Sequence, residues 1–191
     1  MIYMVRHGQT AANSRQLLQG RSDYPLNETG REQAAAAAEM LSGIRFSKVY
    51  SSPLVRAVQT ARIIAPYEEP VTDPRLLEMD YGPYEGTDLN NLPPEIRTFF
   101  SDFVHNEAPH GMEPLGSVVA RTGTFLEELC RVEEPILIST HAIALKGFLE
   151  YLTPESGGSW WSRYVGNCAV FVTEYTDGGF SRPQEVKRAL V

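Results

Sequence analysis

Short runs of apolar and β-branched residues alternate along this chain with longer segments of helical period. Because this alternation is typical of layered α/β folds, it constrains the architecture more than any other feature of the sequence. Strands are predicted at residues 2–5, 45–50, 71–72, 135–139 and 168–173, with a weaker strand at 180–186. Helices are predicted at residues 29–43, 53–65, 115–132 and 142–152. We therefore expect an α/β protein.

Two of these helices carry start signals. Thr29 and Glu32 have the Thr-x-x-Glu spacing of a capping box, and the alanines that follow favour a helix that Gly43 would end. Ser52 is expected to cap the next helix, with Pro53 as its first residue, where a missing N–H costs nothing.

Residues from about 80 to 114 interrupt the alternation with prolines, glycines and aromatic side chains. The aromatic residues, which we expect to be exposed, are Tyr81, Tyr84, Phe99, Phe100 and Phe103. We interpret this segment as a lid-like insertion that holds one short helix. The alternative is a surface excursion packed by its own aromatics. With 191 residues and no repeat or linker, the chain is expected to form one domain over 1–191.

The charge of the chain limits its partners. The formal net charge is −7 and the sequence pI is about 5.1. An acidic surface repels nucleic acid and anionic membranes, so neither is expected as a partner. An anionic substrate would instead need cations concentrated in one pocket. The residues do not indicate an oligomeric state.

Cys130 and Cys168 have no CxxC spacing and no neighbouring histidine cluster, so no metal site is predicted and both are expected to be buried. The first residues enter an apolar run at once, without the basic region and cleavage site of a secretory signal. No apolar segment reaches the ~20 residues that a membrane-spanning helix needs. A cytoplasmic location is expected.

Arg6, His7 and Gly8 come directly after the first predicted strand, at the place where α/β sheets bind ligands. An arginine offers N–H donors that fit phosphate oxygens, and a glycine lets the backbone turn closely around a ligand. Alone, an Arg-His pair indicates only a solvated strand end. His141, however, also follows a predicted strand and precedes a helix. Two histidines in equivalent settings can face one another across a crevice.

Arg56 is predicted in the first turn of a helix, where the helix dipole disfavours a cation. A bound anion would explain this position, because helix N-termini bind phosphate. The alternative is an exposed arginine paired with a surface carboxylate. Glu78 stands at another junction between strand and loop, where its carboxylate could give a proton to a leaving oxygen or form a salt bridge. Asp80 and Glu85 compete for the same role.

These residues form part of a pattern that resembles the histidine phosphatase superfamily, also called phosphoglycerate mutase-like. The similar segments are RHGQT at 6–10 with Asn13 following, QG at 19–20, DYPL at 23–26, the Thr-Gly and Gln-Ala pairs at 29–34, SSPLVRAVQTA at 51–61, LLEMDYGPYEG at 76–86, residues 111–121 and STHA at 139–142. The similarity covers nearly the whole chain in the right order. It implies a three-layer sandwich with a mostly parallel central sheet between helices, no metal and no organic cofactor.

The resemblance also implies roles for individual residues. His7 matches the nucleophile that becomes phosphorylated, and Glu78 matches the proton donor. Arg6, Arg56 and His141 match the groups that surround the transferred phosphoryl. Lesser substrate contacts are implied for Gln9, Thr10, Asn13, Gln19, Gly20 and Ala142. The last of these is a departure, since the family usually has glycine there. The added methyl leaves the backbone N–H in place but would crowd the phosphate.

The activity implied is hydrolysis of small-molecule phosphate monoesters through a phosphohistidine, as in α-ribazole phosphatases. The expected partner is a small phosphorylated metabolite. One alternative is a 2,3-bisphosphoglycerate-dependent phosphoglycerate mutase, although Met79 and Asp80 stand where mutases usually have Arg-His after the glutamate. Another is a phosphate-binding module without catalysis, which the presence of all five central residues disfavours.

Overall fold

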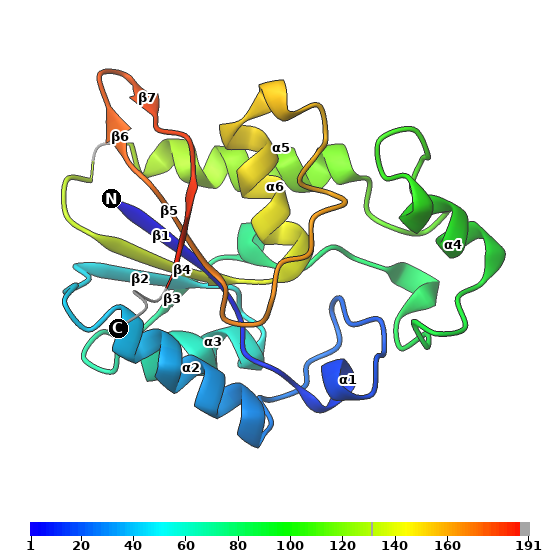
Figure 1. Cartoon of the computed structure of the whole chain (residues 1–191), viewed down its shortest axis with the longest axis horizontal. Coiled ribbons are helices and arrows are strands. Elements are labelled where there is room, and N and C mark those ends of the chain that lie inside the picture. The colour runs from blue at the N-terminus through cyan, green and yellow to red at the C-terminus, as the bar shows by residue number, and fades with distance from the viewer. Residues whose placement is uncertain (131, 188–191) are drawn as a thin grey trace.

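A six-stranded sheet forms the centre of the computed structural model, which describes residues 1–130 and 132–187 (Figure 1). The strand order is β3-β2-β4-β1-β5-β8. These strands are β1 (Ile2–Arg6), β2 (Lys48–Ser51), β3 (Val71–Thr72), β4 (Ile136–Thr140), β5 (Val170–Thr173) and β8 (Gln184–Val186). Strands β1 to β4 are mutually parallel and β5 runs antiparallel to both of its neighbours, so the expected mostly parallel sheet is confirmed.

Helices cover both faces of this sheet and complete a three-layer sandwich (Figure 1). One face carries α2 (Glu28–Met40) and α3 (Val55–Ile64), and the other carries α5 (Leu115–Glu128) and α6 (Ala142–Leu152). Strand β1 shows why both layers are needed. Ile2 and Met4 enter the core beneath α5 and α6, whereas Tyr3 and Val5 enter the core beneath α2 and α3. A strand buried on both faces reads as a continuous apolar run in the sequence.

The register of β1 and β4 positions the loops that follow them. Arg6 pairs with Thr140, and the backbone N–H of His7 donates to the carbonyl of Thr140 at 2.9 Å. Both strands therefore end at the same edge of the sheet. The short helix α1 (Ala11–Ser14) and the segment with α4 (Pro94–Ser101) lie beyond that edge (Figure 1).

The end of the chain differs from prediction. Cys168 is not part of a strand, because its backbone has φ 56° and its N–H donates to the carbonyl of Arg6. Residues 180–186 do not form one strand either. The hairpin of β6 (Tyr175–Thr176) and β7 (Gly179–Phe180) comes first, and β8 follows as a separate strand. Both cysteines are half-buried rather than fully buried.

The expected capping signals at two helix starts were wrong. Helix α2 is capped by Asn27, whose side chain accepts from the N–H of Gly30, and it ends at Met40, before Gly43. Helix α3 begins after Leu54 without a side-chain cap, and Ser52 lies in the preceding turn. In α2 the side chain of Asn27, two residues before Thr29, accepts from the free N–H of the first turn, so the helix begins earlier than predicted. Helix α5 ends at Glu128 instead of at 132, and residue 131 lies outside the described residues.

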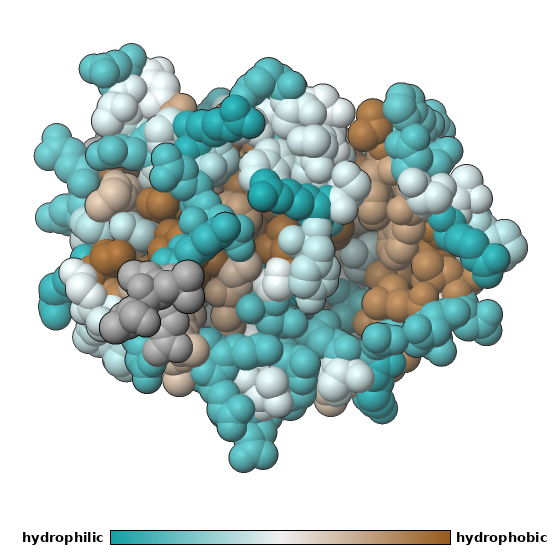
Figure 2. Space-filling view, viewed as in Figure 1, coloured by the Kyte–Doolittle hydropathy of each residue, from teal (hydrophilic) through white to brown (hydrophobic). Residues whose placement is uncertain are grey.

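The insertion packs its aromatic side chains into a core that it shares with other parts of the chain. It holds the one expected α-helix, α4, and a 3-10 turn, η2 (Gly82–Tyr84). Two further 3-10 turns, η1 (Pro74–Leu76) and η3 (Pro154–Ser156), lie outside the insertion. Tyr81 and Phe99 are 5% and 1% exposed. The expectation that these two aromatic side chains are exposed was therefore wrong. They share a core with Met79, Ile96 and Trp161. Exposed apolar side chains such as Val104 remain, and Figure 2 shows apolar surface at this end of the molecule. A role as a lid stays a prediction.

None of the described helices combines the length and the apolar character required to cross a bilayer.

Backbone packs directly on backbone where the loop after β1 meets α2. A Cβ added to Gly30 would lie 2.0 Å from the carbonyl oxygen of Gln9, and one added to Gly8 would lie 2.3 Å from that of Gly30. We expect Gly30→Ala to lower the free energy of unfolding by about 1–3 kcal/mol, because backbone cannot yield as a flexible side chain can. Denaturant titration measures the change.

Gly116 provides a matched control, since it too lies in the first turn of a helix but has open space where a methyl group would be added. Gly116→Ala should raise stability by up to about 1 kcal/mol. Equal effects of the two substitutions would contradict the close-packing account.

Candidate active site

The ends of β1 and β4 bring His7 and His141 together. Their ring centroids lie 5.1 Å apart with an interplanar angle of 63°. The two residues are 3% and 0% exposed. The crevice between histidines that the sequence suggested is therefore a close edge-to-face contact in the protein interior.

The hydrogen bonds of His7 indicate its tautomer. Nδ1 lies 2.7 Å from the carbonyl oxygen of Gly8, which can only accept, so Nδ1 carries the proton and Nε2 keeps its lone pair. Arg56 Nε donates to that Nε2 at 3.2 Å. Burial, followed by the charges of Arg56 and Arg6, holds the pKa of His7 well below its ordinary value. His7 is thus a neutral imidazole whose lone pair lies at Nε2, the form that acts as a nucleophile once a substrate replaces the bond from Arg56.

His141 is assigned the same tautomer, with its proton on Nδ1. Its Nε2 lies 2.7 Å from Ser52 Oγ, and that oxygen already accepts from the N–H of Leu54 at 3.3 Å. We assign the Ser52 hydroxyl as the donor to Nε2, which leaves the proton of the neutral ring on Nδ1. Burial lowers the pKa of His141 well below its ordinary value, and Arg56 lowers it further. His141 consequently offers an N–H donor without adding a charge.

Arg56 is a fully buried cation in the first turn of α3. Nη1 donates to the carbonyl of Ser22 and Nη2 to that of Gly20, both at 2.7 Å. Burial lowers the pKa of Arg56 to about 10, so it keeps its charge at neutral pH. The alternative of an exposed arginine with a surface carboxylate is wrong. The carbonyls hold the guanidinium against the helix dipole and beside His7.

The carboxylate of Glu85 holds the loop that supplies those carbonyls. Its two oxygens accept from the N–H of Gly20 and from the N–H and hydroxyl of Ser22. Asp80 is also occupied, since its Oδ1 accepts from the N–H of Gly82 at 2.8 Å. Both competitors of Glu78 thus bond to the local loops, whereas Glu78 bonds to the helix that follows His141.

Glu78 lies at the N-terminus of α6, the helix that begins directly after His141. Its Oε1 accepts from the N–H groups of Ile143 and Ala144, both at 3.1 Å, and from that of Met79 at 2.9 Å. These N–H groups and the positive end of the helix dipole stabilise a negative charge. Glu78 is 4% exposed. The folded chain thus places the expected acid beside the second histidine.

Three buried side-chain nitrogens have no hydrogen-bond partner among the described residues, and all belong to predicted site residues. They are Arg6 Nε, Gln19 Nε2 and His141 Nδ1. Each such group costs roughly 1–3 kcal/mol when it is buried without a partner. With Nδ1 of His141 protonated, all three are donors. Buried donors without acceptors suit the oxygens of an anion.

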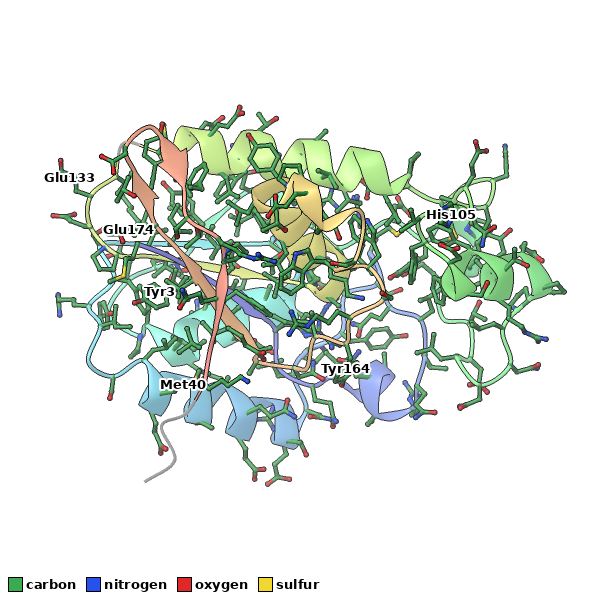
Figure 3. The ribbon with its side chains drawn as sticks, turned by 45° about the horizontal axis from the view of Figure 1, so that its top comes forward. Tyr3, Met40, His105, Glu133, Tyr164 and Glu174 are labelled. Carbon is green, nitrogen blue, oxygen red and sulfur yellow. The ribbon has the colours of Figure 1, made fainter. Side chains whose placement is uncertain are left out.

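The segment between α6 and β5 closes this site from one side. Val165 accepts from Arg6 Nη1 through its carbonyl, and Asn167 Nδ2 donates to the carbonyl of His7 at 3.0 Å. Tyr164 of the same segment is 85% exposed and points away from the core (Figure 3). No signal in the sequence indicated Asn167, nor Thr60, whose hydroxyl accepts from the N–H of Gly8.

The residues predicted as lesser contacts also have structural bonds. Thr10 caps α1 and forms a capping box with Asn13. Thr10 also donates to Gln19 Oε1 at 2.7 Å, and the side chain of Gln9 accepts from Asn27. Gly20 reaches the site through its carbonyl, and Ala142 is the first residue of α6. Contact of these residues with a substrate stays a prediction. No group of three or more His, Cys, Asp or Glu side chains arranged to hold a metal occurs within 1–130 and 132–187.

A comparison with protein families gives this arrangement a context. Residues 2–184 match the histidine phosphatase superfamily (branch 1). The chain belongs to this superfamily. The fold agrees: the phosphoserine phosphatase of Entamoeba histolytica superimposes with a TM-score of 0.86 at 24% identity, over 100% of this chain and 98% of that one.

Other members of the superfamily are more similar in sequence. Fructose-2,6-bisphosphatase TIGAR of Xenopus tropicalis is 40% identical over 136 residues, which are 68% of this chain and 49% of that protein. The chain therefore spans about half the length of this relative. Probable phosphoglycerate mutase GpmB of Yersinia pestis is 32% identical over 92% of this chain and 85% of that protein. A candidate alpha-ribazole-5'-P phosphatase of Escherichia coli has a TM-score of 0.84 at 25% identity, over 100% and 97% of the two chains.

The bond between Ser52 and His141 generates a prediction for this member of the superfamily. Without the hydroxyl, the proton of the His141 ring is free to move to Nε2. Nδ1 then has no proton and can no longer donate a hydrogen bond. We expect Ser52→Ala to remove the Nδ1–H resonance of His141 in ¹⁵N spectra of the histidines and to lower kcat about tenfold or more. Ser52→Thr, which keeps the hydroxyl, is the control. An unchanged tautomer in Ser52→Ala would show that another group fixes it.

Proposed function

We propose that this protein hydrolyses phosphate monoesters of small metabolites by transferring the phosphoryl group to Nε2 of His7. The observation that carries this proposal is the neutral His7, with its lone pair at Nε2, among two guanidinium groups and a set of donors without acceptors. Phosphoryl transfer needs mainly positioning and stabilisation of charge on the phosphoryl oxygens. Arg6, Arg56 and the Nδ1–H of His141 can supply that stabilisation from the protein itself.

The reaction has two steps. In the first, His7 Nε2 forms a bond to phosphorus, the ester P–O bond breaks, and protonated Glu78 gives its proton to the leaving oxygen, which departs as an alcohol. In the second, water attacks the phosphohistidine, the N–P bond breaks, and the Glu78 carboxylate takes a proton from the water. Inorganic phosphate leaves and His7 is again neutral. Glu78 alternates between acid and base, as a group beside the transferred phosphoryl can.

The relatives support a phosphatase. Fructose-2,6-bisphosphatase TIGAR and the candidate alpha-ribazole-5'-P phosphatase of E. coli are both named for phosphate ester hydrolysis. A phosphoserine phosphatase of E. histolytica with 25% identity binds 3-phosphoglyceric acid in its structure. These names point to small phosphorylated molecules as substrates of this chain too.

The similarity to GpmB keeps a mutase as the second candidate. A mutase would return the phosphoryl group from His7 to a phosphoglycerate instead of to water. Against it, Met79 and Asp80 stand where mutases usually have Arg-His, and neither side chain carries a positive charge. Met79 is fully buried, and Asp80 accepts from the N–H of Gly82. A coupled mutase assay with and without 2,3-bisphosphoglycerate separates the two activities. A phosphate-binding module without catalysis is the third candidate, and any release of phosphate excludes it.

We also propose that residues 1–191 act as one domain and that the protein works in the cytoplasm. Cores on both faces of the single sheet support the first point. The two free cysteines fit a reducing compartment.

His7→Ala should abolish release of phosphate from p-nitrophenyl phosphate, because the other buried histidine, His141, has its Nε2 engaged by Ser52 Oγ. Wild-type protein quenched during turnover should carry an acid-labile phosphate on one histidine, visible by ³¹P NMR, and chelators should not reduce its rate. His105→Ala is the matched control, since that side chain is 79% exposed and bonds to Asp102 on its own turn (Figure 3). Full activity of His7→Ala would refute the nucleophile.

Glu78→Gln should separate substrates by their leaving groups. An alkoxide needs a proton as it departs, whereas p-nitrophenolate does not, so we expect kcat/KM to fall about 100-fold for alkyl phosphates and much less for p-nitrophenyl phosphate. Glutamine keeps an oxygen that can accept from the N-terminus of α6. Steady-state kinetics with both substrates measure the ratio. An equal loss for both would mean that Glu78 is not the proton donor.

A further inference from the structure

Lys146 is a buried cation without an ion-pair partner. It lies on α6 and is 9% exposed. Its ammonium donates to the carbonyl of Trp161 at 2.7 Å, and no carboxylate of the described residues lies within ion-pair distance. Two of its three N–H donors thus have no hydrogen bond to a described residue. Buried lysines are rare unless they are paired, because burial without an anion is costly.

The ammonium lies close to the proposed site. Helical side chains lean toward the N-terminus of their helix, so Lys146 extends toward the turn at which Ile143 holds the Glu78 carboxylate. Burial lowers the pKa of Lys146 to about 8, while Glu78 raises it and Arg6 lowers it. The insertion reaches the same point, because the ring centroid of Phe103 lies 5.9 Å from Nζ. Lys146 therefore lies between the phosphoryl site and the insertion.

The nearby carboxylates are already engaged. Glu150, four residues further along α6, accepts from the N–H of Trp160 at 2.7 Å and from the hydroxyl of Ser156 at 2.5 Å. Glu78 accepts from backbone N–H groups at the start of the helix. Neither forms an ion pair with Lys146, so its charge has only the face of the Phe103 ring, and no contacting carboxylate of the described residues, to balance it.

We infer that the Lys146 ammonium binds a carboxylate of the substrate, so that the enzyme prefers phosphate esters of hydroxy acids over esters without an acid group. This inference rests on the proposed function. The phosphoryl group would occupy the donors around His7, and the acid group would extend toward α6 and the insertion.

The surroundings favour a carboxylate over a second phosphate. One ammonium compensates one negative charge, and the adjacent walls are the apolar side chains of Phe103 and the packed segment at Trp161. A phosphate dianion would leave a net negative charge in this buried place, close to Glu78. A carboxylate leaves none.

The test uses two substrates that differ only in the acid group, 3-phosphoglycerate and sn-glycerol 3-phosphate. Wild-type enzyme should show a kcat/KM at least about tenfold higher for 3-phosphoglycerate, as expected for one charge-assisted hydrogen bond. In Lys146→Met, which keeps the length of the side chain without its charge, this ratio should fall toward one. Lys146→Arg should keep more of the ratio than Lys146→Met. Fructose 2,6-bisphosphate tests the second phosphate and should show no comparable dependence on Lys146.

Lys48→Met is the matched control, because Lys48 is exposed on β2, and it should not change the ratio. Calorimetric binding of the same two compounds to His7→Ala protein makes the result independent of turnover, with and without the Lys146 substitution. If the wild type released no phosphate from any ester, the proposed function would fail while binding could still show the preference. An identical ratio in wild type and Lys146→Met, an equal loss for both compounds, or a stronger dependence for the bisphosphate would overturn the inference.

Discussion

The pairing of Arg6 with Thr140 in neighbouring parallel strands is the constraint on which the site depends. It sets β1 and β4 in a register that ends both strands at one level, so His7 and His141, the next residues along the chain, emerge side by side. Side chains alternate between the two faces of a sheet, so a slip of one residue would send one ring into the wrong layer. The apolar alternation in β1, divided between the two cores, prevents such a slip.

Around this pair the protein holds its arginines by hydrogen bonds to backbone carbonyls and not by ion pairs with carboxylates of the described residues. Backbone carbonyls at Gly20 and Ser22 take the place of an anion for Arg56, and both histidines remain neutral. The donors left without acceptors lower the stability of the fold, a cost that a bound phosphoryl group would remove. A site of this kind is more favourable with a ligand than without one. Stability and binding are therefore linked.

The sequence predicted the elements well because strongly apolar strands and the regular helix after His141 leave little choice. It also indicated that His7, His141 and Arg56 would meet. It could not predict the strand order, which places β1 between β4 and β5 through contacts between distant segments. The cap at Asn27 was missed because the Thr29 and Glu32 spacing was equally plausible locally. Other features depend on contacts between distant parts of the chain, which no local sequence pattern indicates. In the sequence Glu85 competes with Glu78 for the role of proton donor, whereas in the structure its carboxylate holds the loop at Gly20 and Ser22.

The central place of β1 has a consequence for how the protein is made. Strand β1 leaves the ribosome well before β4 and β5, its two neighbours in the sheet. Until those strands have been synthesised, β1 is an apolar strand with two unpaired edges, a form prone to association with other chains. The proposed phosphoryl site can form only after β4 has emerged, and chaperones that shield the nascent chain would find β1 exposed throughout that interval.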